Sequence, residues 1–147
     1  MRLWHYKLLK FLPKSQLLAQ WRELNSIFKK QDKHILINYV YEYSNSELYM
    51  YSILVIKEME NRGYKIKSFD NMKKFFEIEN IKDTWFYLRY DNTWQLFKNH
   101  HNDRYLLQCF FNLQEKYDRG QKDFTDECYN GLRELVNEKF DLTEFNL

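Results

Sequence analysis

Apolar positions recur with helical spacing in the first third of the chain. Leu17, Trp21, Leu24 and Phe28 follow one another at intervals of three or four residues, which places them on one face of a helix. Pro13 suits the first turn of such a helix, because the first turn leaves its backbone N–H groups unpaired and proline has none. The pattern therefore predicts a helix from about residue 13 to about residue 30, with a buried apolar stripe.

A second face of this predicted helix is polar. At about 100° per residue, Gln16, Gln20 and Glu23 fall within about 40° of one another. The carboxylate of Glu23 is thus grouped with two amides, close in sequence to the start of the chain at Met1. An α-amine and a carboxylate can together perform Schiff-base chemistry, since the unprotonated amine is a nucleophile and the carboxylate transfers protons. The two glutamines fit equally a solvated polar surface.

The next part of the chain contains one ambiguous segment and one clear helix. Residues 35–43 have the composition of a strand, and they fit either a short extended segment or a buried turn. Ser44 and Glu47 form a capping box that opens a helix, and Gly63 is a stop signal after its end near Arg62. The inward positions predicted for this helix are Leu48, Tyr51, Val55 and Met59.

Three further helices are predicted in the second half of the chain. The first is short, at about residues 71–79, and the second runs from an N-cap at Asp103 to about residue 117, with a stop near Gly120. The last spans about residues 124–139, whereas the aromatic residues 85–96 fit no single element. The sequence thus predicts a mainly α protein, a single compact domain of about four to five helices over residues 1–147.

Charge is distributed unevenly along the chain. Residues 1–33 contain eight basic and two acidic residues, a net charge of +6, whereas residues 68–147 contain eleven basic and fifteen acidic residues, a net charge of −4. A basic N-terminal third fits a surface that faces a polyanion, and it fits equally a solvated helix face. Aromatic residues make up 19% of the chain, which fits either an A/T-rich coding sequence or a few rings that stack on bases.

Composition and spacing argue against several classes of protein. No apolar run approaches the ~18 residues that span a membrane, and lysines interrupt the apolar stretches near the start, so we expect neither a membrane segment nor a signal peptide. Cys109 and Cys128 lack metal-type spacing and are predicted to be buried free thiols in a reducing cytoplasm. His100 and His101 have no spaced partners, so we expect no metal site.

The first half of the chain also contains an ordered set of short motifs. These are residues 1–5 (Met-Arg-Leu-Trp-His), 12–13, 16–24, 33–34, 38–40 and 58–66, with a faint echo at residues 114–116. The set resembles the pyrimidine-dimer DNA glycosylase/AP lyase family of phages and chlorella viruses, and more closely the short prokaryotic branch that begins Met-Arg-Leu-Trp-His. The resemblance covers about residues 1–66 and includes an acid about twenty residues from the N-terminus, here Glu23.

This resemblance implies a mechanism. In the family, the α-amine of the mature N-terminus attacks C1′ of a damaged nucleotide, the glycosidic bond breaks, and an imine joins protein to DNA. β-Elimination then cuts the strand on the 3′ side of the abasic sugar. The resemblance implies that Glu23 orients the sugar and assists proton transfer, and that Arg22 contacts DNA near the lesion. The implied partner is double-stranded DNA with a lesion, and no cofactor is expected.

The chain departs from the phage members of the family at two positions. Those enzymes expose a threonine after removal of the initiator methionine, whereas residue 2 is Arg2, a bulky residue that normally blocks this removal. We therefore expect the nucleophile to be the amine of Met1. A family arginine that follows the glutamate by three residues is replaced by Ser26, and the aromatic- and lysine-rich tail has no counterpart. The lesion need not be a pyrimidine dimer.

Two groups of candidate site residues follow. The predicted catalytic residues are Met1, Arg2, Glu23 and His5, and the predicted DNA-binding residues are Arg22, Gln16, Lys33, His34 and Lys14. Arg2 would contact a phosphate beside the lesion. His5 fits either a base, since its pKa range suits that task, or a packed histidine. His34 fits either a phosphate contact or a cap for backbone groups.

The function predicted from the sequence is thus a DNA repair glycosylase/AP lyase that acts as a monomer in the cytoplasm on pyrimidine-dimer-like or abasic lesions. Two alternatives remain open at this point. One is a non-catalytic nucleic-acid-binding module of the same fold, and the other is a structural or interaction protein. The acidic second half of the chain favours the last of these.

Overall fold

The computed structural model describes residues 2–81 and 95–145, and within these ranges the protein is helical and has no strand. Its α-helices are α1 (Lys14–Lys29), α2 (Asn45–Asn61), α3 (Asp70–Phe76), α4 (Asp103–Asp118) and α5 (Asp126–Asn137). Its 3₁₀ helices are η1 (Tyr6–Phe11), η2 (Asn38–Glu42) and η4 (Thr143–Phe145). The predicted mainly α fold is confirmed. The ambiguous aromatic segment at 85–96 falls, except for its last two residues, outside the described residues.

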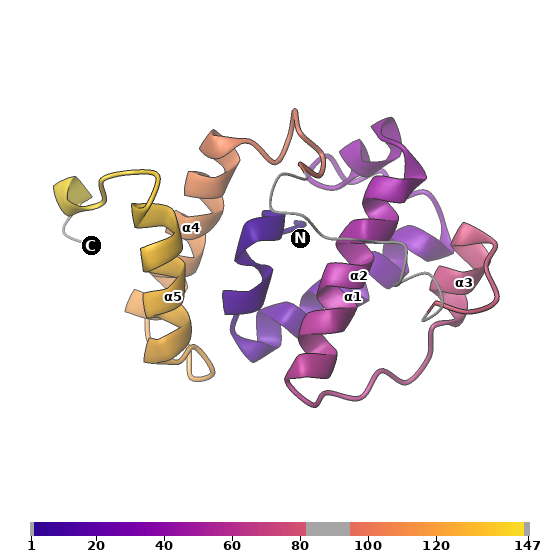
Figure 1. Ribbon diagram of the computed structural model, residues 1–147, viewed down its shortest axis with the longest axis horizontal. Coiled ribbons are helices and arrows are strands. Elements are labelled where there is room, and N and C mark those ends of the chain that lie inside the picture. Colours follow the sequence, from indigo (N-terminus) through magenta and orange to yellow (C-terminus); the bar gives the residue numbers. More distant parts are fainter. Residues whose placement is uncertain (1, 82–94, 146–147) are drawn as a thin grey trace.

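The N-terminal segment, which we define as residues 2–11, lies between two groups of helices. α1 packs against α2 and α3, α4 packs against α5, and η1 contacts α2, α4 and α5. Figure 1 shows α4 and α5 together at one end of the molecule, α1 and α2 in the middle, and the indigo N-terminal segment between them. Leu3, Trp4, Leu8 and Leu9 are buried there. Residues 2–11 thus join the two groups.

The apolar stripe predicted for the first helix forms the inner face of α1. Leu17, Leu24 and Phe28 are buried, while Trp21 is partly exposed and meets the ring of Phe69 edge-on, at a centroid distance of 6.0 Å. The helix begins one residue later than predicted, because Pro13 is its N-cap rather than part of its first turn. This shift moves no residue of the apolar or polar face.

The start and end of α2 follow the sequence signals, with one difference. Ser44 is the N-cap, and its hydroxyl accepts a hydrogen bond from the Ser46 N–H at 3.2 Å. Glu47 was predicted to complete a capping box, but its carboxylate accepts the Phe97 N–H at 2.9 Å instead. The helix ends before Gly63, which has a φ of 79°. All four predicted inward positions are buried: Leu48, Tyr51, Val55 and Met59.

Several other boundaries differ from the prediction by a few residues. α3 ends at Phe76, because Glu77 adopts a left-handed conformation with a φ of 54°. The N-cap of α4 is Asn102 rather than Asp103, and its side chain accepts the Tyr105 N–H at 3.0 Å. Thr125 caps α5, which is therefore shorter at both ends than predicted.

Residues 35–43 and the cysteines can now be placed. Residues 35–43 form a turn followed by η2, so the segment is not extended, but the turn is only partly buried because Ile35 and Leu36 are exposed. Cys109 is buried as predicted, but Cys128 is only partly buried, and both are free thiols.

None of the helices in the described part of the chain combines the length and apolar composition that crossing a membrane requires.

Candidate active site

A hollow of about 230 Å³ lies between the N-terminal segment, α1 and α4. Its lining residues are Arg2 and Trp4 from the segment, Gln16, Ala19, Gln20 and Glu23 from α1, and Asn112 and Lys116 from α4. The polar face predicted for the first helix therefore forms one wall of this hollow. Two predicted catalytic residues, Arg2 and Glu23, and one predicted DNA-binding residue, Gln16, meet there.

Glu23 has an incompletely paired carboxyl group. The side chain is half-buried, and its Oε1 atom is shielded from solvent without a hydrogen-bond partner among the described residues. Burial raises the pKa of this carboxyl group, and the positive charge of the N-terminal amine is the strongest influence in the opposite direction. Asp32 raises the pKa further, and Arg22 lowers it. A raised pKa favours proton transfer near neutral pH. Met1 itself lies outside the described residues.

The side chain of Gln20 holds the N-terminal segment against α1. Its Nε2 atom donates to the Arg2 carbonyl at 3.1 Å, and its Oε1 atom accepts the Trp4 N–H at 2.8 Å. Gln20 is only 2% exposed, although the helical pattern had also fitted a solvated surface position. It lies one turn before Glu23, so the same stretch of α1 supplies the carboxylate and the clamp for the segment.

Two tyrosines complete this clamp from other helices. The hydroxyl of Tyr105 in α4 donates to the Leu3 carbonyl at 2.6 Å, and the hydroxyl of Tyr51 in α2 donates to the Trp4 carbonyl at 2.6 Å. Together with Gln20, these side chains hold all three carbonyl groups of residues 2–4. The direction in which the chain enters the hollow is therefore determined by three helices at once.

Arg2 is shared by two hollows. Its guanidinium lies 5.6 Å from the centre of the Trp4 ring, within the range of a cation–π contact. It lines the hollow that contains Glu23, and it also lines a second hollow of about 210 Å³. The lining of this second hollow includes Ile35, Leu36 and Tyr105. A positive charge at this junction suits the predicted contact with a phosphate.

His5 is buried and is engaged with backbone groups on both sides of its ring. Its Nδ1 atom accepts the Lys7 N–H at 3.2 Å, which caps η1, and its Nε2 atom lies 3.1 Å from the His101 carbonyl. Burial, aided by the charge of Lys7, lowers the pKa of His5 to about 4. The imidazole is thus neutral at pH 7. Of its two sequence interpretations, this geometry is that of the packed histidine.

The remaining predicted DNA-binding residues lie along α1 and in the loop after it. Arg22 is exposed on α1 next to Glu23, and Lys33 is exposed in the loop. Lys14 stands at the other end of α1, with its ammonium group 5.3 Å from the centre of the Tyr64 ring. The fold therefore brings Arg22 near Glu23 and leaves Lys14 apart from the hollow.

His34 caps a backbone group in the same loop. Its Nδ1 atom accepts the Leu36 N–H at 3.2 Å, which is one of the two roles that the sequence allowed. The side chain is also exposed, and its charge lowers the pKa of Glu23. A phosphate contact from the outer side of the ring remains a prediction.

Two lining residues were missed by sequence reasoning. Asn112 and Lys116 reach the hollow from α4, about ninety residues after Glu23 in the chain. The faint echo of family motifs at residues 114–116 includes Lys116 and was the one available signal. Because α4 also supplies Tyr105, the second half of the chain contributes both to the wall and to the clamp.

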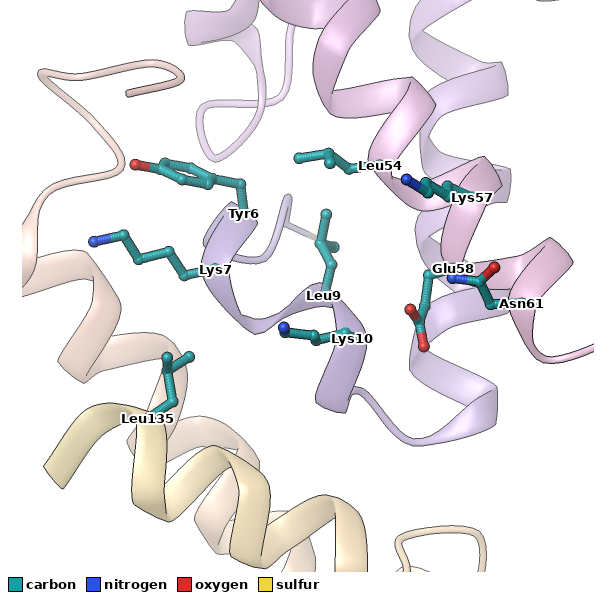
Figure 2. Close-up of a pocket in the computed structure, with 9 residues that line it drawn as sticks. All are labelled: Tyr6, Lys7, Leu9, Lys10, Leu54, Lys57, Glu58, Asn61 and Leu135. Atoms are coloured by element: carbon teal, nitrogen blue, oxygen red, sulfur yellow. The ribbon is translucent and has the colours of Figure 1, made fainter. Parts of the chain in front are cut away.

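A larger hollow lies elsewhere in the described part of the chain. It measures about 530 Å³ and is bounded by η1, α2 and Leu135 of α5. Figure 2 shows its lining side chains, with Lys7 and Lys57 on opposite sides and their amines not converging. It shares no residue with the Glu23 hollow, so size does not identify the candidate active site.

Comparison with known families gives one match. Residues 1–72 match the model of a family described as pyrimidine dimer DNA glycosylase. The matched region includes the N-terminal segment, α1, α2 and the start of α3, and therefore Glu23 and its clamp residue Gln20. It identifies the family and does not distinguish a branch. No curated protein and no solved structure matched the chain.

Proposed function

Because residues 1–72 belong to the pyrimidine dimer DNA glycosylase family, we propose that this protein is a DNA glycosylase/AP lyase that works through an imine at its N-terminus. The family name implies glycosylase activity on damaged DNA. The proposal adds the lyase step, the nucleophile and the residue that moves protons. Its substrate is duplex DNA that contains a pyrimidine-dimer-like lesion or an abasic site.

The proposed reaction has two stages. The unprotonated amine of Met1 attacks C1′, and the base leaves with the electrons of the glycosidic bond and receives a proton. Loss of the ring oxygen from C1′ then gives the imine between the amine and the opened sugar. Removal of a C2′ proton expels the 3′ phosphate by β-elimination, and water finally releases the protein. At an abasic site, the amine condenses with the sugar aldehyde and water is the leaving group.

Glu23 is proposed to serve as the acid and base of this sequence. Burial raises the pKa of its carboxyl group, which favours the protonated form that can supply a proton to the leaving group. Once ionised, the carboxylate stabilises the cationic imine and takes up the C2′ proton. The unpartnered Oε1 atom supports this role, because a buried carboxylate oxygen without a hydrogen-bond partner in the described residues keeps its acceptor capacity for a substrate proton.

The clamp on residues 2–4 supports the choice of nucleophile. Gln20, Tyr51 and Tyr105 hold the backbone directly before the hollow, so little chain freedom is left to lose when the amine meets the sugar. Such preorganisation lowers the entropic part of a reaction barrier. Arg2 and Arg22 then supply positive charge for the phosphates that flank the lesion.

One observation carries the proposal, namely that Arg2 and the half-buried Glu23 line one hollow. Borohydride trapping tests it, on a duplex with a single abasic site and with untagged protein whose N-terminal mass is verified. We expect a covalent protein–DNA adduct that maps to the first residue. Binding without an adduct would contradict the imine and leave the non-catalytic DNA-binding module as the function.

A matched pair of variants tests the role of Glu23. Glu23→Gln removes the ionisable group at nearly constant volume, so we expect strand cleavage to fall about 10²- to 10⁴-fold while DNA binding is largely retained. Glu60→Gln makes the same change at an exposed position of α2 outside the hollow and should cleave like the wild type. Cleavage of abasic DNA by Glu23→Gln at the wild-type rate would show that the assignment is wrong.

A further inference from the structure

Two large apolar side chains stand at the surface next to the candidate active site. Ile35 is 81% exposed and Leu36 is 45% exposed, in the loop between α1 and η2. Both line the second hollow, which shares Arg2 with the hollow that contains Glu23. Exposure of apolar surface is unfavourable in water, so an exposed apolar pair beside a candidate active site is a candidate contact surface.

The loop that displays these side chains is held by its own hydrogen bonds. The N–H groups of Ile37 and Asn38 donate to the His34 carbonyl at 3.0 and 2.8 Å, and the Leu36 N–H donates to His34 Nδ1. Ile37, the next residue, is fully buried and anchors the turn to the core. The exposure of Ile35 and Leu36 is therefore built into an ordered turn.

A hydroxyl group and a carboxylate fix the start of the same loop. The Tyr41 hydroxyl accepts the Asp32 N–H at 2.9 Å, and Asp32 in turn accepts the His34 N–H at 2.9 Å. The Ser26 hydroxyl of α1 donates to the Asp32 carboxylate at 3.4 Å, which holds this loop against α1 three residues after Glu23. The apolar tip and the predicted catalytic acid thus belong to one surface.

The charge around the apolar tip fits a nucleic acid. Lys29, Lys30 and Lys33 are exposed on the chain just before it, and Arg104 lines the same hollow from α4. Phosphates on both sides of a base step would meet these cations while apolar side chains meet the bases. Acidic side chains near the tip are limited, among the described residues of this loop, to Asp32, which is engaged inside it.

We propose that Ile35 and Leu36 form an apolar wedge that enters the base stack of duplex DNA beside the lesion. The proposal rests on the proposed function, because it names how that function would open its substrate. C1′ of a stacked nucleotide is inaccessible to an amine, so the duplex must be kinked or unstacked. Aliphatic side chains that enter a base step unstack it partially and kink the duplex.

The first test measures unstacking without any chemistry. The probe is a duplex with 2-aminopurine next to a tetrahydrofuran abasic analogue, which lacks the C1′ hydroxyl and forms no imine. We expect wild-type protein to raise the fluorescence, and the double variant Ile35→Ala/Leu36→Ala to lose most of that increase at saturating protein. Phe145→Ala is the matched control, since Phe145 is 55% exposed and lines neither hollow. It should keep the wild-type increase.

The second test compares borohydride trapping on duplex and single-stranded abasic DNA. We expect the double variant to react about tenfold more slowly on the duplex and within about twofold of wild type on the single strand, which has no stack to open. Equal losses on both substrates would overturn the wedge, because they would place the defect in the site itself. An unchanged fluorescence increase in the double variant would overturn it as well.

The outcomes separate the wedge from the proposed reaction. Fluorescence that depends on Ile35 and Leu36, without trapping on any DNA, would support the wedge and contradict the imine. Borohydride trapping by the wild type without a fluorescence increase would support the imine and contradict the wedge. A second copy of the chain is the other molecule that could cover Ile35 and Leu36, and sedimentation velocity tests for it. A wild-type protein that is dimeric, with a double variant that is monomeric, would overturn the wedge.

Discussion

The matched region, residues 1–72, and the unmatched region that contains α4 differ in charge and in family resemblance, yet both line the hollow around Glu23. The first 33 residues have a net charge of +6, whereas residues 68–147 have a net charge of −4. The side chains that α4 places in the hollow do not follow that trend, since they are an amide and a lysine, Asn112 and Lys116. Average charge is therefore a poor guide to what one face of a helix presents.

The comparison assigns different tasks to the two regions. The matched region supplies the carboxyl group and the segment that leads to the amine, and α4 closes the hollow and holds the Leu3 carbonyl through Tyr105. A family match can thus end at residue 72 while part of the support for the hollow comes from an unmatched region. The predictions below test this division of tasks, from the largest expected effect to the smallest.

Low pH should destabilise the packing between the N-terminal segment and the part of the chain that contains α4. His5 of the N-terminal segment and His101, which precedes α4, are both buried with lowered pKa values, mainly because of burial. A histidine with a lower pKa in the folded state binds its proton more readily when unfolded. The free energy of unfolding should therefore fall as the pH drops from about 6.5 to about 4, by on the order of 3 kcal/mol from His5 alone.

Urea unfolding at a series of pH values measures this effect. His5→Asn keeps an acceptor for the Lys7 N–H and has no group that titrates in this range. We expect the variant to be less stable at pH 7 but to lose less stability between pH 6.5 and 4. Parallel pH curves for the variant and the wild type would contradict the assignment, because His101 and the carboxyl groups would then account for all of the loss.

Removal of the Gln20 amide should break the clamp within the matched region. Gln20→Leu leaves the Trp4 N–H and the Arg2 carbonyl without their partner. We expect the free energy of unfolding to fall by about 2 kcal/mol and the borohydride trapping rate to fall about 30-fold at a temperature where the variant is folded. Gln31→Leu, an exposed glutamine after α1, is the control. A trapping rate that follows only the folded fraction would show that the clamp has no role in the reaction.

Removal of one hydroxyl should test the contribution of α4 to that clamp. Tyr105→Phe keeps the ring and loses the donor to the Leu3 carbonyl, so we expect a loss of about 1 kcal/mol in stability and about fivefold in trapping rate. Tyr117→Phe is the matched control on α4, because that hydroxyl bonds Asp126 of α5 and is away from the segment. If both variants behave alike, α4 supports the fold and not the site.

Local signals explain which parts of the fold could be predicted from the sequence. Ser44 and Gly63 mark the ends of α2 because capping and a positive φ depend on a few neighbouring residues. The polar face of α1 was identified correctly because helical periodicity alone places Glu23 and its neighbours together. The short-range rules were less exact where two capping residues compete, as at Asn102 and Asp103.

Long-range contacts explain most of what could not be predicted. Gln20 is buried because the backbone of residues 2–4 lies on it, and no helical pattern contains that information. Glu47 leaves its capping box because Phe97, fifty residues later, offers an N–H. Lys116 reaches the hollow only through the packing of η1 between the two helical groups, so a faint motif was its one trace in the sequence.

Removal of the lysine that α4 places in the hollow should give the smallest effect of these changes. Lys116 is the basic residue that α4 places in the hollow, and a phosphate contact there would release about one counterion. Lys116→Ala should raise the Kd for an abasic duplex about threefold at 0.1 M salt and reduce the slope of log Kd against log salt by about 0.9. Lys122→Ala removes the same charge at an exposed site beyond α4 and should change neither quantity appreciably. Fluorescence anisotropy at several salt concentrations provides both numbers. If both variants weaken DNA binding equally, binding depends only on the total charge of this region. The direct contacts with the substrate would then all come from residues 1–72.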